Sequence, residues 1–438
     1  MIRNGGGPGN AVGRRLRAAS VPGVSLDRRQ DRPRPPLPRA VVEMNWIVPE
    51  RPAVAPPRRR CYHAGLLSHA MRIVLITDAW YPQVNGVVTT WNHVREQCQS
   101  LGHAFEVVHP GLFRTIKAPR YPDIRLAVLP RFKLRRTLDG MNPDAVHIAT
   151  EGPLGMAARR WCRSRRKPWT TSYHTQFPHY LKTYFGIPQR WTYRFCRWFH
   201  GGAERTLVPT RSIKDELVER GFDADRLVVW TRGVDHATFH PYPEDAQPLA
   251  DLPRPRFVYC GRVAAEKNIE AFLGLKLEGV KVVIGDGPAR PELARRYPEV
   301  HFAGWKKGEA LARHVAACDV FVFPSKTDTF GVVMIEALAC GLPVAAYPVT
   351  GPRDVITDPR VGALDDDLQR AAEQAAGLNP DDCIAFAKGF TWQRCAAMVL
   401  ENLATDADPL LPAAEGPGGD GGADAGGADG PRGPGERA

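Results

Sequence analysis

The sequence has no apolar run long enough to cross a membrane. The longest candidate, residues 337–349, is interrupted by Gly341 and Pro343, whereas a membrane-spanning helix needs about 20 consecutive apolar residues. The first 70 residues also lack the apolar core of a secretory signal. We therefore expect neither a transmembrane helix nor a secretory signal, and a cytoplasmic location fits best.

Paired cysteines and known phosphate-binding motifs are also lacking. The nine cysteines are irregularly spaced and include no Cys-x-x-Cys pair, so neither a disulfide framework nor a zinc site is indicated. The acidic run at 365–367 has no partner cluster of metal ligands, and we predict no bound metal. No G-x-G-x-x-G follows a strand and no G-x-x-x-x-G-K-[ST] occurs, which argues against dinucleotide redox chemistry and P-loop hydrolysis.

Basic charge is abundant and unevenly distributed. The formal net charge is +12. Residues 1–70 hold thirteen arginines and four acids, whereas residues 405–438 hold two arginines and seven acids. A basic leader can be a nucleic-acid-binding arm, but these arginines are scattered among prolines without interleaved aromatics. We predict no nucleic-acid partner, and a non-catalytic nucleic-acid-binding protein is the alternative of a different class.

Composition divides the chain into six segments. Residues 1–70 are expected to be a disordered Arg/Pro-rich leader, or to precede a true start at Met71, because they cannot bury enough apolar surface to offset the entropy lost on ordering. The other expected segments are an N-terminal domain over 71–236, a linker over 237–256, a C-terminal domain over 257–387, a helix over 388–404 that returns to the N-terminal domain, and a disordered Gly/Asp-rich tail over 405–438.

Apolar strand patterns alternate with helical patterns in both domains. We expect strands at 72–76, 105–108, 124–128, 145–148 and 169–173, and then at 256–260, 280–284, 300–303, 320–323 and 343–346. Apolar strands alternating with helices are typical of parallel sheets covered by helices on both faces. The predicted fold class is α/β, with two Rossmann-like doubly wound domains facing a cleft.

Two cations follow the strand at 256–260. Gly261 lets the chain turn at the carboxyl end of that strand, where doubly wound sheets bind ligands. Arg262 and Lys267 then place two positive charges near the start of the next helix, which suits a diphosphate. The alternative is that both are ordinary solvated cations.

Two carboxylates, Asp328 and Glu336, follow the strand at 320–323. The first lies in a loop and the second inside a helix, so they can contact different parts of an extended ligand. Phe330 and Gly331 offer backbone N–H groups at the helix N-terminus, which attract anions. The alternative is that Asp328 only favours the helix N-terminus and Glu336 lies in a buried salt bridge.

Two residues of the first domain complete the candidate site. His174 follows the strand at 169–173 and can donate a hydrogen bond to a sugar hydroxyl or a phosphate. Gly86 lies in the turn after the first strand, where a missing side chain permits close backbone approach to a ligand. A structural histidine and an ordinary loop glycine are the alternatives.

Taken together, these segments resemble the family 4 glycosyltransferases, which are retaining sugar-nucleotide enzymes of the GT-B fold. The resemblance spans residues 71–404 and rests on six motifs in order: QVNGV, YHTQFP, GVDHATFHP, GRVAAEKN, GDGP at 285–288, and the acid-x7-acid motif running into EALACGLPVAAYPVTGP. The sequence departs from the family in one respect, because the first acid is usually Glu and here is Asp328.

The resemblance implies a role for each matching residue. Arg262 and Lys267 would neutralise the donor diphosphate, His174 and Asp328 would contact the donor sugar, and Glu336 would bind the ribose hydroxyls. His174, Asp328, Arg262 and Lys267 are thus the predicted catalytic residues. Further donor contacts would come from Gly86, Asp286, Thr329, Phe330 and Gly331. The family needs no metal, so no cofactor is expected, and the nucleotide sugar is a substrate.

The residues of several motifs look most like those of the branch that glycosylates diacylglycerol and related lipids. The motifs are TDAWYPQVNGVVTT, HIATEGPLG, YHTQFPHY, SKTDTFG and AAYPVTGP. This implies retaining transfer of glucose, glucuronate or mannose from a nucleotide-diphosphate sugar to a lipid hydroxyl, with uridine and guanosine both open as the donor base. The alternatives are a GDP-mannose-dependent mannosyltransferase acting on another lipid or soluble acceptor, and a domain pair that binds a sugar nucleotide without transferring it.

Residues 188–200 suggest how such an enzyme reaches a bilayer. An aromatic stripe with a basic flank is formed by Trp191, Phe195, Trp198 and Phe199 with Arg190, Arg194 and Arg197. A second basic cluster consists of Arg159, Arg160, Arg163, Arg165, Arg166 and Lys167. Interfacial helices combine these features, so we predict peripheral binding to an anionic surface at the inner face of the cytoplasmic membrane. The alternative is that the aromatics pack inside the domain and the arginines form its solvated face.

Overall fold

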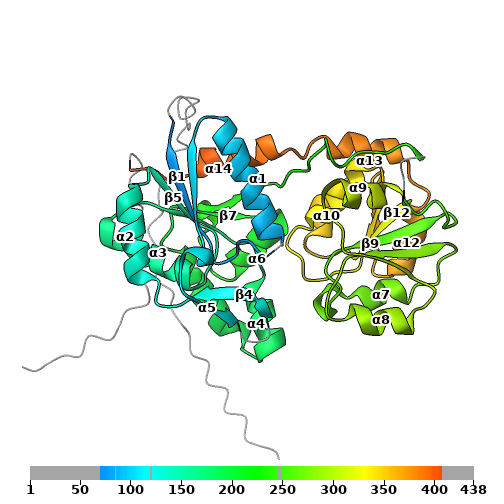
Figure 1. The fold of residues 1–438 in the computed structure, drawn as a ribbon, viewed down its shortest axis with the longest axis horizontal. Coiled ribbons are helices and arrows are strands. Elements are labelled where there is room, and N and C mark those ends of the chain that lie inside the picture. Colours follow the sequence, from blue (N-terminus) through cyan, green and yellow to red (C-terminus); the bar gives the residue numbers. More distant parts are fainter. Residues whose placement is uncertain (1–69, 84, 119–120, 245–247, 407–438) are drawn as a thin grey trace, which may run out of the picture. The chain divides into compact units, whose positions relative to one another are not determined.

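The computed structural model describes residues 70–83, 85–118, 121–244 and 248–406. The leader predicted over 1–70 lies outside these residues except for Ala70, and the tail predicted over 405–438 except for Thr405 and Asp406. The described residues form two six-stranded parallel sheets and a separate two-stranded sheet, with helices flanking each of the larger sheets (Figure 1). Among these residues, no helix combines the length and apolarity that a membrane span requires.

The first sheet has the strand order β2-β1-β5-β6-β7-β8. Its strands are β1 (Arg72–Ile76), β2 (Ala104–Val108), β5 (Ala145–Ile148), β6 (Thr170–Ser172), β7 (Arg205–Val208) and β8 (Leu227–Val229). Its helices are α1 (Gly86–Ser100), α2 (Arg131–Met141), α3 (Pro153–Arg165), α4 (Phe177–Phe185), α5 (Gln189–His200) and α6 (Arg211–Glu219). The central strands β5 and β6 are buried at every residue, because helices cover both faces of a parallel sheet.

The second sheet has the order β11-β10-β9-β12-β13-β14. Its strands are β9 (Arg256–Cys260), β10 (Val280–Ile284), β11 (His301–Gly304), β12 (Val320–Phe323), β13 (Val344–Ala346) and β14 (Gly362–Leu364). The helices of this part are α7 (Ile269–Leu273), α8 (Arg290–Arg296), α9 (Gly308–Ala316), α10 (Val332–Ala339), α11 (Pro352–Val355), α12 (Leu368–Ala375) and α13 (Pro380–Ala387).

Each sheet has a point at which the strand order reverses. In the first sheet β1 lies between β2 and β5, and in the second β9 lies between β10 and β12. Connections leave such a point toward opposite faces, which opens a crevice at the carboxyl ends of the strands where ligands bind. The segments after β1, β9 and β12 carry most of the predicted site residues.

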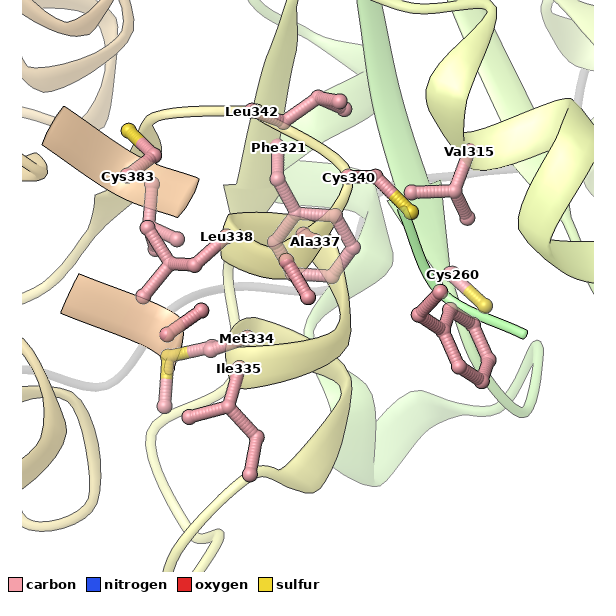
Figure 2. Packing of buried hydrophobic residues seen from close by; sticks show 14 of the residues in the cluster. Cys260, Val315, Phe321, Met334, Ile335, Ala337, Leu338, Cys340, Leu342 and Cys383 are labelled. Atoms are coloured by element: carbon pink, nitrogen blue, oxygen red, sulfur yellow. The ribbon is translucent and has the colours of Figure 1, made fainter. Parts of the chain in front are cut away.

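The core of the second sheet shows why these strands and helices form. One face packs the apolar side of α10 against the strands, with Phe321, Met334 and Leu338 fully buried (Figure 2). Cys260 and Cys340 belong to the same cluster, and burial raises the pKa of each thiol well above its usual value. All eight cysteines in the described ranges are buried and free, so they act as small apolar residues.

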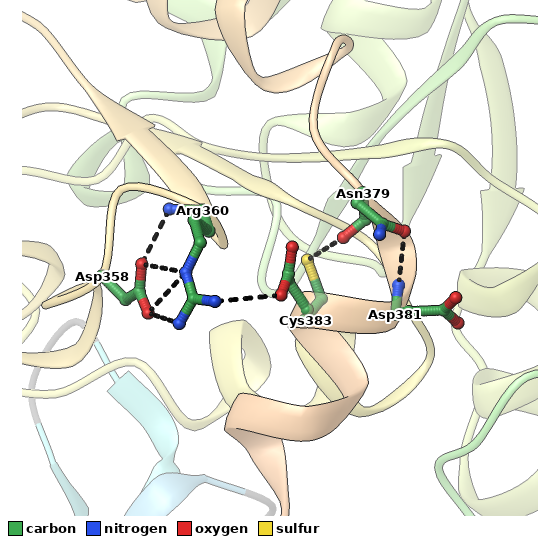
Figure 3. A network of polar contacts seen from close by, with 6 residues as sticks. Asp358, Arg360, Asn379, Asp381 and Cys383 are labelled. Carbon is green, nitrogen blue, oxygen red and sulfur yellow. Dashed lines mark hydrogen bonds and ion pairs between the residues drawn. The ribbon is translucent and has the colours of Figure 1, made fainter.

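Polar contacts fasten α13 to the loop that precedes β14. Arg360 pairs with Asp358 at 2.7 Å and with Asp382 at 3.4 Å, and the side chain of Asn379 accepts the N–H of Asp381 at 3.0 Å (Figure 3). The Arg360 side chain is 69% exposed, and exposed pairs contribute little to stability. This network orients a helix and shares no residue with the predicted site.

A helix near the end of the described chain packs with the first sheet. Helix α14 (Trp392–Asn402) contacts α1, and Trp392 stacks on His93 with ring centroids 4.4 Å apart. Buried Val399 and Leu400 join the apolar cluster that contains Ile73 of β1. The chain that forms the second sheet thus returns and completes the core of the first.

The strand predicted at 124–128 was expected in the large parallel sheet, and this expectation is wrong. Strand β4 (Tyr121–Ala127) pairs antiparallel with β3 (Thr115–Ala118) in a sheet of their own. The short strands β7, β8 and β14 were not predicted either. They are three or four residues long and, unlike the equally short β5 and β12, none of them is buried at every residue, so they lack a contiguous buried apolar run.

The predicted aromatic stripe of α5 is divided by the fold. Trp191 and Trp198 are 57% and 47% exposed, whereas Phe199 is fully buried. Arg159 does not belong to a solvated basic cluster: it is 7% exposed, lies 3.9 Å from the Trp198 ring centroid and donates to the carbonyl of Phe199. Lys167 is also buried, and it pairs with Asp406. Two of the six expected surface cations are therefore structural.

Candidate active site

The loops after β9 and β12 meet at the reversal point of the second sheet. Lys267 ends the 3-10 turn Ala265–Lys267, and its Nζ lies 2.6 Å from Oδ1 of Asp328. The two side chains are only 24% and 20% exposed. Oδ2 of Asp328 is buried and has no partner among the described residues. A buried carboxylate oxygen without a partner is suited to accept a hydrogen bond from a ligand hydroxyl.

Gly285 of the GDGP motif lies where the backbones of two neighbouring loops come close together. The N–H of Gly261 donates to the carbonyl of Ile284 at 3.0 Å. A Cβ on Gly285 would lie 1.9 Å from the Gly261 carbonyl oxygen, and the φ of Gly285 is +147°. A side chain at position 285 would therefore force apart the loops that follow β9 and β10.

Arg262 and Asp286 lie on these two adjacent loops. The N–H of Val263 donates to the carbonyl of Asp286 at 3.0 Å, which fixes the loop of Arg262 beside that of Asp286. The Asp286 carboxylate accepts the N–H of Gly287 at 2.7 Å and pairs with Arg290 at 3.2 Å. Asp286 is thus engaged within its own loop, whereas the side chain of Arg262 is exposed.

The segment Asp328–Gly331 leads into α10. Gly331 has a φ of +84°, and a Cβ there would lie 2.8 Å from Cε of Met334. Phe330 is 7% exposed and belongs to the apolar cluster of the second sheet. The hydroxyl of Thr329 donates to the carbonyl oxygen of His174 at 2.8 Å. This hydrogen bond joins the acidic loop after β12 to the segment that follows β6.

Glu336 lies inside α10 among apolar neighbours. Burial raises the pKa of its carboxyl group to about 7. No cation pairs with Glu336 within the ranges that the structure describes, so the salt bridge considered as its alternative is not found there. A desolvated carboxyl group without an ion pair is a strong hydrogen-bonding group for hydroxyls.

His174 is a neutral histidine with a defined tautomer. Its Nε2 lies 2.7 Å from the indole Nε1 of Trp91. Because an indole nitrogen only donates, Nε2 accepts and Nδ1 carries the proton. Burial, with Arg232 and His147 nearby, lowers the pKa of His174 well below its usual value. His174 can therefore offer an N–H to a ligand at neutral pH but cannot serve as an acid.

Gly86 begins α1 after the Asn85 cap, whose side chain accepts the N–H groups of Val87 and Val88 at 3.1 Å each. Gly86 is exposed, and a Cβ built on it meets no atom within 4 Å. The fold itself therefore does not demand glycine here.

Sequence reasoning missed Arg232. It follows β8, is 3% exposed, and its guanidinium lies 4.1 Å from the Trp230 ring centroid and 5.6 Å from that of Phe330. One sequence feature could have pointed to Arg232, namely its position immediately before the GVDHATFHP motif. A single arginine in a loop carries no periodic pattern, so the motif alone could have drawn attention to it.

Metal ligands do not gather in the described ranges. No group of three or more His, Cys, Asp or Glu side chains there is arranged to hold a metal ion. Positively charged side chains on the segments that carry the candidate site include Arg232, Arg262 and Lys267.

Comparison with known proteins decides the family. Residues 84–238 match the model of Glycosyltransferase Family 4, and residues 254–379 match that of Glycosyl transferases group 1. A GDP-mannose-dependent alpha-mannosyltransferase of Mycobacterium tuberculosis is 32% identical, covering 67% of this chain and 83% of the relative. The chain belongs to glycosyltransferase family 4. It is therefore a glycosyltransferase.

Two further comparisons agree with this assignment. An alpha-monoglucosyldiacylglycerol synthase of Streptococcus pneumoniae is 27% identical over 71% of this chain and 79% of its own length. The solved structure of Anabaena Alr3699/HepE in complex with UDP aligns with a TM-score of 0.59 at 16% identity, covering 76% of this glycosyltransferase and 99% of that chain. The predicted GT-B fold, with two Rossmann-like sheets, is confirmed. The roles of the individual site residues stay predictions.

Proposed function

We propose that this glycosyltransferase moves a hexose from a nucleotide-diphosphate sugar to a hydroxyl group of a lipid acceptor such as diacylglycerol, with retention at the anomeric carbon. The observation that carries the proposal is the Lys267–Asp328 pair at the reversal point of the second sheet. It combines a cation for a phosphate with a carboxylate oxygen for a sugar hydroxyl, and that oxygen has no partner in the part of the chain that the structure describes. The lipid acceptor is supported by the relative named as a monoglucosyldiacylglycerol synthase.

The four predicted catalytic residues each have a part in the proposed reaction. The bond between the sugar and the diphosphate breaks while the acceptor oxygen attacks from the same face, and the departing phosphate takes the acceptor's proton. Arg262 and Lys267 stabilise the charge that develops on the diphosphate. His174 donates Nδ1–H to the sugar, and Asp328 accepts from a sugar hydroxyl. Fixed side-chain cations supply the charge compensation, so we propose that no metal is required.

Transfer of mannose from GDP-mannose to another lipid or to a soluble acceptor is the second candidate. The relative that is 32% identical carries this donor in its name, and the relative named for monoglucosyldiacylglycerol synthesis is less similar, at 27%. The same site residues serve both candidates, because diphosphate and hexose hydroxyls are common to both donors.

A donor-by-acceptor matrix tests the proposal. Purified full-length protein is incubated with radiolabelled UDP-glucose, UDP-glucuronate or GDP-mannose, and with vesicles that contain diacylglycerol, plain vesicles, or a soluble sugar acceptor. We expect label in the lipid extract with one donor and with diacylglycerol vesicles, and an α-linked product by NMR. Arg262→Ala is expected to lower the rate by orders of magnitude. Label only in the soluble acceptor would refute the lipid proposal.

Access to a lipid requires a surface that binds a membrane, and α5 offers one part of it. Trp191 and Trp198 remain exposed, and the exposed Arg190, Arg194 and Arg197 lie on the same helix. Tryptophan and arginine at headgroup depth are typical of interfacial helices. We propose that this face of α5 contacts anionic lipid at the inner face of the cytoplasmic membrane.

A second part of the proposed membrane-binding surface, which we call the hairpin surface, consists of exposed apolar and basic residues between 112 and 136. Leu129 and Phe132 are 88% and 79% exposed. The backbone N–H of Val128 donates to the carbonyl of Arg114 at 2.8 Å, which holds the two ends of the β3–β4 pair together. The exposed cations of this surface are Arg114, Lys117, Arg125, Arg131, Lys133, Arg135 and Arg136.

Charge complementarity favours an anionic bilayer as the partner of the hairpin surface. Asp123 is the only acid in the sequence between residues 112 and 136. Each Lys or Arg near an anionic membrane contributes about 1 kcal/mol, and exposed leucine and phenylalanine side chains can enter the headgroup region. The enzyme would thus bind the same membrane that contains its lipid acceptor.

Vesicle co-sedimentation tests this membrane proposal. The double variant Leu129→Ser/Phe132→Ser is compared with Trp305→Ser, which removes an exposed aromatic residue (55% exposed) that lies directly after β11, outside both proposed membrane-binding parts. We expect wild type and Trp305→Ser to bind anionic vesicles at low salt and to dissociate at high salt, because salt screens exposed charges. Equal binding of the double variant, or equal binding to neutral vesicles, would contradict the proposal.

A further inference from the structure

Among the residues that the structure describes, Arg232 is a buried cation without an acidic partner. It is 3% exposed, and its guanidinium donates to the carbonyl of the neighbouring Thr231 at 3.0 Å. No carboxylate in the described ranges pairs with it, and the Cys395 thiol nearby is uncharged at neutral pH because burial raises its pKa to about 12. Burial lowers the pKa of Arg232 to about 10, so the side chain is still charged at neutral pH. Charges buried in proteins are normally paired.

Arg232 lies with the residues of the candidate site. Its guanidinium contacts the Phe330 ring at 5.6 Å, and Phe330 directly follows Thr329, whose hydroxyl donates to the carbonyl of His174. The His174 and Trp230 rings are 5.8 Å apart, and Arg232 lies over Trp230 at 4.1 Å. The cation is thus held where the segments after β6, β8 and β12 meet.

Two explanations compete for a cation in this place. Arg232 could be a structural residue, held by cation–π contacts with Trp230 and Phe330. Such contacts offset only part of the cost of removing a guanidinium from water. The second explanation is a counter-ion brought by the substrate, and every nucleotide-diphosphate sugar carries two phosphates.

We propose that Arg232 is an oxyanion-binding residue of the active site, which pairs with an acidic group of the donor: the phosphate next to the sugar, or an acid group on the transferred sugar. The inference rests on the proposed use of a nucleotide-sugar donor. Arg262 and Lys267 approach the donor from the loop after β9, whereas Arg232 approaches from the segment after β8. A guanidinium suits this task because its donors match the geometry of phosphate and carboxylate oxygens.

Binding measurements test the inference. The affinities of wild type, Arg232→Gln and Arg232→Lys are measured by calorimetry for UDP, UDP-glucose, UDP-glucuronate, GDP and GDP-mannose. Arg295→Gln, which alters an exposed arginine in the last turn of α8, is the matched control. We expect Arg232→Gln to weaken the best-bound donor about tenfold to a hundredfold, Arg232→Lys to weaken it less, and Arg295→Gln to have no effect.

The pattern of loss distinguishes the two sources of the oxyanion. A loss shared by neutral and acidic sugar nucleotides assigns Arg232 to the phosphate. A loss confined to UDP-glucuronate assigns it to the acid group of the sugar. Unchanged affinity for all nucleotides in Arg232→Gln, with weaker binding in Lys267→Gln, would overturn this inference while leaving the proposed function intact. No binding by wild type would overturn both.

Thermal unfolding without ligand separates binding from structural support. Removing an uncompensated buried charge relieves its desolvation penalty, so Arg232→Gln is expected to unfold at the same temperature as wild type or higher. Saturating donor should then stabilise wild type more than the variant. A clearly lower midpoint with normal nucleotide affinity would make Arg232 a structural residue and refute the inference.

Discussion

Breaking the Lys267–Asp328 pair from either side is the sharpest test of the candidate site. Lys267→Met removes the cation while keeping a similar side-chain length, and Asp328→Asn removes the charge while keeping the shape. In the structure Nζ and Oδ1 are 2.6 Å apart, and the side chains are 24% and 20% exposed. Without Lys267, neither oxygen of the Asp328 carboxylate would have a partner among the described residues.

The expected magnitudes follow from this partial burial. Exposed pairs contribute about 0.2–1 kcal/mol to stability, and removing one member of a buried pair costs about 3–5 kcal/mol. A pair that is three-quarters buried lies between, so Lys267→Met should destabilise the protein by about 1–3 kcal/mol. Its effect on catalysis should be larger. Loss of one donor to a developing oxyanion costs about 2.7–4 kcal/mol, which lowers the rate by about 10²–10³.

The assay combines nucleotide release at saturating acceptor with thermal unfolding of each variant. If Lys267 and Asp328 act as one unit, the double variant should lose no more activity than the worse single variant, because effects of contacting residues are not additive. Asp328→Glu should retain more activity than Asp328→Asn, since position can relax and charge cannot. Fully additive losses, or normal turnover in Lys267→Met, would refute the reasoning.

Three further predictions concern other parts of the site. Burial raises the pKa of Glu336 from 4.5 to about 7, so between these pH values the folded state binds more protons than the unfolded state, and the stability of the protein falls as pH rises. Glu336→Gln should therefore unfold at a higher temperature than wild type at pH 8 but not at pH 5. The same variant should bind nucleotide more weakly than wild type at both pH values. Gly86→Ala should leave the unfolding temperature of ligand-free protein within about 1 °C of wild type, because a Cβ there meets no atom, and should weaken donor binding in calorimetry; normal binding would remove Gly86 from the site. Turnover should be unchanged in excess EDTA, and a loss restored by added divalent metal would show that the side-chain cations are insufficient.

Much of the fold could be predicted because buried strands of a parallel sheet consist of contiguous, mostly apolar residues. The strands expected at 72–76, 145–148, 256–260 and 320–323 coincide with β1, β5, β9 and β12. The hairpin β3–β4 could not be placed, because Tyr121–Ala127 alternates polar and apolar residues as an antiparallel strand does and pairs only with its neighbour. Pairing partners depend on tertiary packing, which periodicity does not record.

The site was predictable where a residue follows a recognisable strand, and not elsewhere. Lys267 and Asp328 follow β9 and β12, and because these strands are neighbours in the sheet, their loops meet. Arg232 follows β8, a three-residue strand that gives no periodic signal. The contact of Thr329 with His174 joins residues 155 positions apart and depends on how the two sheets' loops approach, which the sequence does not state.

The shorter acid at position 328 is understandable from the contacts that its two oxygens make. Oδ1 of Asp328 lies 2.6 Å from Nζ of Lys267, and Oδ2 is buried without a partner within the described ranges. The aspartate side chain is therefore long enough to reach Nζ of Lys267 from the loop after β12. The same pairing holds Lys267 in a fixed position, so that its charge would already be oriented for the phosphate that we propose it binds. The departure from the family's usual glutamate therefore preserves the combination of a fixed cation and a free carboxylate oxygen on which the proposed chemistry depends.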